Sequence, residues 1–226
     1  MKSFATLSFL ILFLFFDKDI QKTVYPKWQI WAYQNDSDLK KDSKTVNAKD
    51  KKLVDLGQKL NAIKEKKDGD KTYYQVQLPD TTKYWVNAGE VTEKYITINS
   101  SDVVTYSQPD NSPGYINNDF KLQPGDFGYF VKEQAGFINV DFISYMPRGN
   151  DKKVVWVGNV WINGGYTDDV KYAKEAFYIA YAYNQIYAKT PNIDNAKYYL
   201  KKAMSANGDD KTELVSVAQQ VLDGLK

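Results

Sequence analysis

The sequence predicts a mainly β protein with a C-terminal α-helical part, in which two small β-barrels precede a three-helix unit. From Tyr25 to about Ile98, apolar residues recur in short alternating runs separated by turn residues, which is typical of β-strands. A weaker copy of this arrangement follows. From Thr167 the apolar period changes to about 3.6 residues, that of a helix. We therefore expect four segments, at residues 1–22, 23–99, 100–165 and 166–226.

The first segment, residues 1–22, has the pattern of a signal peptide or an N-terminal anchor. Met1 and Lys2 form a short basic start, and residues 4–16 are apolar apart from one threonine and one serine. This run has the length of a signal-peptide apolar region and is short of the roughly 20 residues of a spanning helix. We expect export to the periplasm, the cell envelope or the medium, with membrane contact only through this segment. Cleavage stays open, and a buried core element is the alternative.

The second segment, residues 23–99, is expected to form a barrel of five short strands. Apolar residues alternate at 28, 30 and 32, a mostly apolar run follows at 53–63, and turn residues stand at 67–70. Tyr74, Val76 and Leu78 alternate with glutamines before a second turn. The charges of residues 36–52 alternate in sign, which favours a solvated loop over a partner-binding segment.

Four motifs stand in order along this segment: Leu-Gly-Gln-Lys-Leu at 56–60, Gly-Asp at 69–70, Tyr-Tyr-Gln-Val-Gln-Leu-Pro at 73–79 and Tyr-Trp-Val-Asn at 84–87. With these motifs the segment resembles a bacterial SH3 domain. Tyr74 departs from the tryptophan that is common in the family, and Tyr84 replaces a glycine. The third segment resembles the same domain, since Val-Val-Trp-Val at 154–157 stands where the first copy has Tyr-Trp-Val. The resemblance implies SH3-like barrels with grooves that receive peptide or cell-wall stems.

The fourth segment, residues 166–226, is expected to contain three helices. Thr167 is the expected N-cap of a first helix that runs to about Lys189, and a second helix ends at Gly208. A capping box at 210–213 precedes the apolar stripe of a third helix. At the spacing of a tetratricopeptide-type motif stand Tyr183, Asn184, Tyr187, Ala196, Leu200 and Ala203. The first two helices therefore resemble a single repeat of that type. A lone repeat buries little apolar surface by itself, so we expect this unit to pack on the second barrel or on another chain.

The composition excludes several kinds of chemistry. The chain has no cysteine and no histidine, which removes disulfides, thiolate nucleophiles, imidazole bases and Cys/His zinc sites. Arg148 is the only arginine and the net charge is +2, so no nucleic-acid partner is expected. We expect no cofactor and no enzyme activity. A glycan hydrolase or an oxygen-ligand metal site built from Asp119, Asp126 and Asp141 is a distant alternative.

Aromatic residues make up 15% of the chain and supply the candidate binding residues. For the barrel grooves, the candidate ligand-binding residues are Tyr33, Tyr74, Trp85, Tyr106, Tyr129 and Trp156. For Trp85 and Trp156, core packing is the favoured interpretation. In the helical unit, Tyr178, Tyr181 and Gln185 would lie on the face where tetratricopeptide-type units hold peptides, although core packing is favoured there too.

The expected function is that of an exported, non-catalytic cell-envelope binding or scaffold protein. Its SH3-like aromatic grooves would recognise cell-wall peptide or an envelope protein. The alternative is a protein–protein assembly adaptor that uses the C-terminal helical unit.

Overall fold

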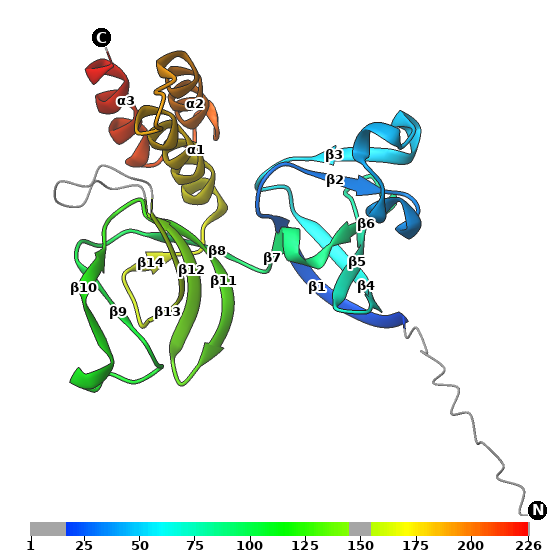
Figure 1. Cartoon of the computed structure of the whole chain (residues 1–226), viewed down its shortest axis with the longest axis horizontal. Coiled ribbons are helices and arrows are strands. Elements are labelled where there is room, and N and C mark those ends of the chain that lie inside the picture. Colours follow the sequence, from blue (N-terminus) through cyan, green and yellow to red (C-terminus); the bar gives the residue numbers. More distant parts are fainter. Residues whose placement is uncertain (1–16, 145–154, 226) are drawn as a thin grey trace, which may run out of the picture.

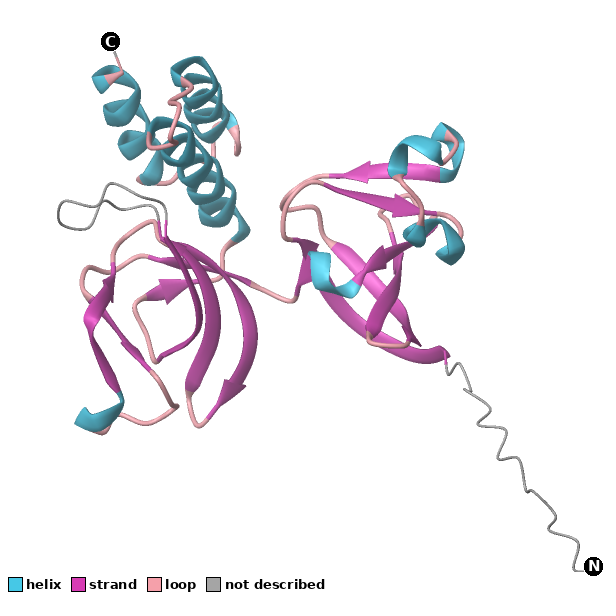
Figure 2. Ribbon diagram, viewed as in Figure 1, coloured by secondary structure: helices cyan, strands magenta, loops and turns pink. Residues whose placement is uncertain are grey.

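The structure is a computed structural model that describes residues 17–144 and 155–225. This part of the chain forms two curled antiparallel β-sheets followed by three α-helices (Figure 1). The predicted mainly β architecture with C-terminal helices is therefore confirmed. Figure 2 shows the two sheets as separate bodies, with the helices gathered at one end of the second.

The first sheet has the strand order β3-β2-β6-β5-β4-β1-β7 in the described residues. Its strands are β1 (Asp17–Pro26), β2 (Ile30–Tyr33), β3 (Lys51–Val54), β4 (Leu60–Asp68), β5 (Lys71–Gln77), β6 (Lys83–Asn87) and β7 (Val91–Thr92). In β2, Ile30 and Ala32 are buried while Trp31 between them is exposed, as the alternation of a strand requires. Strand β1 begins at Asp17, so it includes six residues of the segment expected to be a signal peptide.

The second sheet has the order β10-β9-β13-β12-β11-β8-β14 in the described residues. Its strands are β8 (Tyr95–Ile98), β9 (Val103–Tyr106), β10 (Ile116–Leu122), β11 (Phe127–Gln134), β12 (Phe137–Ser144), β13 (Val155–Ile162) and β14 (Tyr166–Thr167). Strand β8 pairs with β11 and β14, although the sequence placed these residues in the first barrel. Each sheet thus has seven described strands, where five were expected for the first barrel, because short or charged strands such as β1 and β7 carry little sequence signal.

The charged stretch 36–52 differs from the expected solvated loop. It folds into the 3-10 helices η1 (Asp36–Lys40), η2 (Ser43–Thr45) and η3 (Ala48–Asp50). Ion pairs join Asp36 to Lys66 and Lys40 to Asp68, and both partners lie on β4. Val46 is buried. The alternating charges therefore pair with a neighbouring strand and hold the segment against the first sheet.

The helices are α1 (Val170–Ile186), α2 (Ile193–Ser205) and α3 (Leu214–Gly224). The N-cap of α1 is Asp169 rather than Thr167, because the Asp169 carboxylate accepts the backbone amide of Lys171 at 3.0 Å. The Thr167 hydroxyl instead accepts the amide of Asp169 at 3.2 Å. Within the described residues, no helix has the length and apolar character needed to cross a membrane.

The helical unit packs on the second sheet, as predicted. One buried cluster joins Tyr95 and Phe127 of that sheet to residues on all three helices. The rings of Phe127 and Phe177 meet edge to face, with centroids 6.0 Å apart. Leu56 of the first sheet's β3–β4 turn belongs to the same cluster. The start of α1 therefore lies where both sheets contribute to one core.

Candidate ligand-binding cleft

Two buried tyrosines of the second sheet hold the chain that leaves β1. The Tyr95 hydroxyl donates a hydrogen bond to the carbonyl of Pro26 and accepts the amide of Gly57 at 3.0 Å. The Tyr129 hydroxyl donates to the carbonyl of Lys27 at 2.7 Å. Burial raises the pKa of both hydroxyls, so both stay protonated donors at neutral pH. These bonds fix the first sheet against the second.

The turn between β3 and β4 comes close to α1 at Gly57. This glycine has a φ of +80°, a left-handed conformation that side chains disfavour. A Cβ at this position would stand 2.3 Å from Cε of Lys174 and 3.0 Å from Cγ1 of Val170. The glycine thus permits the close approach, and the turn becomes one wall of a cleft against the helices.

The cleft has a volume of about 320 Å³. It is lined by two residues that follow β1, two of the β3–β4 turn, and six of α1 and α2: Trp28, Gln29, Asp55, Leu56, Phe177, Tyr178, Tyr181, Tyr198, Tyr199 and Lys202. Tyr181 contacts Phe177 with ring centroids 4.5 Å apart and Tyr199 at 5.4 Å. Trp28 and Tyr198 are 39% and 51% exposed. The cleft therefore has a packed aromatic floor and accessible rings at its rim.

A second cavity of about 260 Å³ shares four lining residues with the cleft. The shared residues are Asp55, Leu56, Tyr178 and Lys202, and the second cavity adds Lys174, Ser205 and Ala206. The two cavities form one groove, with aromatic rings at one end and lysines at the other. We call this groove the interdomain groove.

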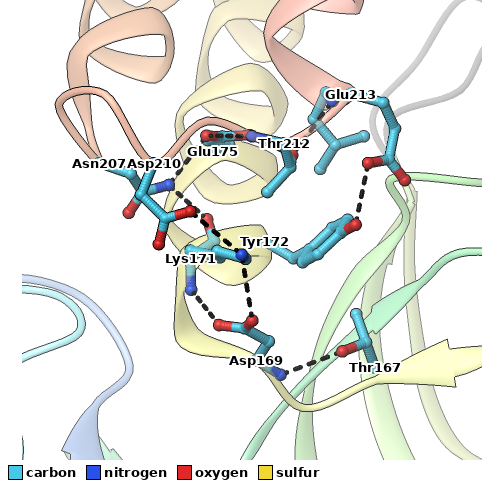
Figure 3. A network of polar contacts seen from close by, with 10 residues as sticks. Thr167, Asp169, Lys171, Tyr172, Glu175, Asn207, Asp210, Thr212 and Glu213 are labelled. Atoms are coloured by element: carbon cyan, nitrogen blue, oxygen red, sulfur yellow. Dashed lines mark hydrogen bonds and ion pairs between the residues drawn. The ribbon is translucent and has the colours of Figure 1, made fainter.

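A buried polar network fixes the loop that follows α2, one wall of the groove (Figure 3). The carboxylate of Glu175 is fully buried and accepts hydrogen bonds from the side-chain amide of Asn207 at 2.8 Å and from the backbone amide of Thr212 at 3.2 Å. The Thr212 hydroxyl donates to the other carboxylate oxygen. Nearby, the Tyr172 hydroxyl donates to Glu213 at 2.9 Å. The network ties α1 to the α2–α3 loop.

Two of the three candidate partner-binding residues line the groove. Tyr178 and Tyr181 do so, whereas the side-chain oxygen of Gln185 accepts a hydrogen bond from Asn195 at 3.3 Å near the α1–α2 turn. The groove is also lined by four residues that were not among the predicted site residues: Trp28, Tyr198, Tyr199 and Lys202. The run Tyr198-Tyr199 was a usable signal, because adjacent helical residues cannot both face one core.

The barrel candidates are dispersed over the two sheets. Tyr33 and Tyr106 are each less than a tenth exposed, which does not fit the expected role in an open groove, whereas the 8% exposure of Trp85 agrees with the favoured expectation of core packing. Tyr33 and Trp85 are partners across β2 and β6. Tyr74 is half-buried, and its hydroxyl accepts a hydrogen bond from Lys22 at 2.9 Å.

Tyr129 and Trp156 do come together, with ring centroids 6.2 Å apart. Tyr129 is buried at 3% exposure, whereas Trp156 is 55% exposed. The favoured expectation of core packing for Trp156 is therefore wrong. Its ring lies beside a strand of the second sheet and can receive a flat apolar partner.

Asp126 and Asp141, two of the three carboxylates proposed as a catalytic or metal-binding set, each accept a hydrogen bond from a backbone amide. Asp126 is buried and accepts the amide of Gln123 at 3.0 Å. Asp141 accepts the amide of Asn159 at 2.7 Å. The side chain of Asp119 lies outside the described residues. Across 17–144 and 155–225, no group of three or more acidic side chains is arranged to hold a metal ion.

Comparison with protein-family models, with curated proteins and with solved structures gave no match.

Proposed function

We propose that this chain is a non-catalytic binding protein that holds a segment of another polypeptide in the interdomain groove. The observation that carries the proposal is the composition of the cleft, in which six of the ten lining residues are aromatic. They come from parts of the chain that are about 150 residues apart or more, and buried hydrogen bonds keep those parts together. A preformed cleft lined by aromatic side chains is typical of a ligand site.

The size of the cleft favours a peptide over a folded domain. About 320 Å³ is at the lower end for small-ligand pockets and accommodates one or two side chains. Tyrosine and tryptophan at the rim offer large apolar area with little rotamer entropy to lose. The proposal makes the helical unit part of the binding site, together with the first sheet, in the manner of an assembly adaptor.

We also propose that the protein is exported and that it has a tandem SH3-like architecture. The apolar run 4–16 supports export, and hence a partner in the cell envelope. The two curled antiparallel sheets and the repeated Trp-Val pairs at 85–86 and 156–157 support a tandem SH3-like architecture. In this arrangement the sheets form the scaffold, and the groove between sheet and helices forms the site.

Selection from a displayed random-peptide library tests the groove. The full chain serves as bait, and the affinity of the selected peptides is measured by fluorescence anisotropy. Trp28→Ala and Tyr198→Ala are each expected to weaken binding at least about tenfold, since both remove exposed aromatic anchors from the rim.

The matched control is Trp31→Ala. Trp31 is 36% exposed, close to the 39% of Trp28, and it does not line the cleft. This variant is expected to bind the selected peptides like the unchanged chain. If the selection yields peptides whose affinity depends on Trp31 and not on Trp28 or Tyr198, the groove is not the site.

A second candidate function rests on the exposed ring of Trp156 beside Tyr129. This surface favours cell-wall binding by the second sheet, as the resemblance to SH3 domains implies. Cosedimentation with purified cell wall tests it: Trp156→Ala abolishes sedimentation if the candidate is correct, and Trp28→Ala leaves it unchanged. Equal sedimentation of Trp156→Ala and the unchanged chain rules the candidate out.

A further inference from the structure

The lysine end of the interdomain groove carries more positive than negative charge. Lys202 and Lys174 both line it. In the described part of the chain, neither lysine forms an ion pair. The acidic side chain in the groove is Asp55, which accepts a hydrogen bond from the side-chain amide of Gln29 at 2.5 Å. Two positive charges therefore face one negative charge.

Lys202 is held where the aromatic and basic ends meet. Its Nζ lies over the ring of Tyr178 at 5.5 Å and over that of Tyr198 at 5.1 Å. Hydrogen bonding to Tyr198 raises the pKa of Lys202, so the group stays a cation throughout the physiological range. The ammonium group is thus oriented by two rings that also line the ligand site.

Lys174 is positioned by the turn on the opposite wall. Its aliphatic chain runs beside Gly57, where an added Cβ would stand 2.3 Å from Cε. The side chain is half-buried, which limits its freedom before a ligand arrives. A carboxylate between Lys174 and Lys202 would gain two charge-assisted hydrogen bonds while its neighbouring residue entered the aromatic end.

From this juxtaposition we propose that the groove selects an acidic polypeptide segment, in which an aspartate or glutamate stands close to an apolar or aromatic residue. The inference rests on the proposed function, because it assigns a ligand chemistry to the same groove. The acidic segment is the occupant whose charge complements the groove. Its carboxylate lies at the lysine end, and its apolar side chain packs on the tyrosines.

Three labelled peptides test this selectivity. They share the same leucine and phenylalanine and carry glutamate, glutamine or lysine at the remaining positions. In low salt, the full chain is expected to bind the glutamate peptide about tenfold more tightly than the glutamine peptide, and the lysine peptide most weakly. The preference is expected to shrink in high salt, because the lysines are accessible to counterions.

Charge reversal on the protein provides the second arm. Lys174→Glu and Lys202→Glu are each expected to weaken the glutamate peptide about tenfold and to affect the glutamine peptide much less. Lys201→Glu is the matched control, because Lys201 is exposed on α2 next to Lys202 and does not line the groove. Circular dichroism of each variant verifies that the fold is kept.

Equal affinity for the glutamate and glutamine peptides, both lost in Trp28→Ala, would overturn the acidic assignment and leave peptide binding intact. An oligonucleotide of equal charge that binds as tightly as the glutamate peptide would also overturn it, because the lysines would then form a general polyanion surface. Failure of every peptide, library-selected ones included, would instead reject the proposed function.

Discussion

Individual side-chain hydroxyls, those of Tyr95 and Tyr129, join the first sheet to the second. Tyr95→Phe removes the hydroxyl that bonds both Pro26 and Gly57, and it leaves the carbonyl of the buried Pro26 and the amide of the half-buried Gly57 without this partner. We expect a loss of about 1–3 kcal/mol in the free energy of unfolding, measured by urea denaturation. Tyr74→Phe is the control, since its half-buried hydroxyl bonds a lysine that also pairs with Glu93. Equal losses in the two variants would contradict the role given to Tyr95.

Glu175 is the second residue whose removal is expected to be costly. Glu175→Ala removes the acceptor of the Thr212 backbone amide and one of the two acceptors of the Asn207 side-chain amide, which keeps its bond to the Lys171 carbonyl at 2.9 Å. The expected cost is about 2–3 kcal/mol in the free energy of unfolding by urea. Glu213→Ala is the control, because that carboxylate is exposed and bonds one tyrosine hydroxyl. A Glu175→Ala variant as stable as the control would mean that the network is not structural.

The sequence identifies the aromatic residues as candidates for binding, but it does not predict whether each side chain faces the core or the surface. Tyr33 and Trp85 lie in short strands of β-type sequence, where a shift of one residue reverses the face. Their burial is set by the curl of the sheet, which depends on distant strands. Tyr178 and Tyr181 were found because a helix places residues three apart on one face.

At the scale of elements, α1 divides its aromatic residues between the core and the groove. Both Phe177 and Tyr181 line the cleft, but Phe177 is 7% exposed and packs on Phe127 beneath it, whereas Tyr181 is half-buried. Phe177→Ala is expected to lower the free energy of unfolding by about 3–5 kcal/mol, as large-to-small core changes do. Tyr181→Ala is expected to cost less than half as much in the same thermal or urea unfolding experiment and to weaken ligand binding. A larger loss of stability in Tyr181→Ala than in Phe177→Ala would contradict this division and make Tyr181 the main core contact between α1 and the second sheet.

Elements with strong periodicity were predicted well, and elements defined by partners were not. The three helices were found within a few residues of their bounds, because apolar periodicity and capping residues are local signals. The strand β1 was missed over 17–22, where alternating charges conceal a strand that pairs with β4. The charges of residues 36–52 indicate a solvated loop for the same reason, because the residues that pair with Asp36 and Lys40 lie on β4, which is distant in sequence.

For the whole molecule, the shared core predicts cooperative unfolding. One buried cluster contains Leu56 of the first sheet, Tyr95 and Phe127 of the second, and residues of all three helices. The far-ultraviolet signal of the helices and the near-ultraviolet signal of the aromatic residues are therefore expected to change in a single thermal transition. Separate transitions for the helices and the sheets would contradict a common core.

The interdomain groove itself could not have been predicted at this scale. Its walls come from residues near 28, near 55 and from 174 to 206, and no local pattern in the sequence joins these segments. Their meeting depends on the hydroxyls of Tyr95 and Tyr129 and on the glycine at 57. The composition did indicate a chain rich in binding aromatics, but the position of the site is a property of the assembled fold.

The most direct test of the central claim is to locate the bound peptide by photocrosslinking. A photoreactive benzoylphenylalanine in place of the exposed Tyr198 at the groove rim, or in place of Trp31 outside it, is irradiated with a library-selected peptide. The account predicts a crosslink from position 198, suppressed by excess unlabelled peptide, and none from position 31. A crosslink from position 31 with none from position 198 would contradict it.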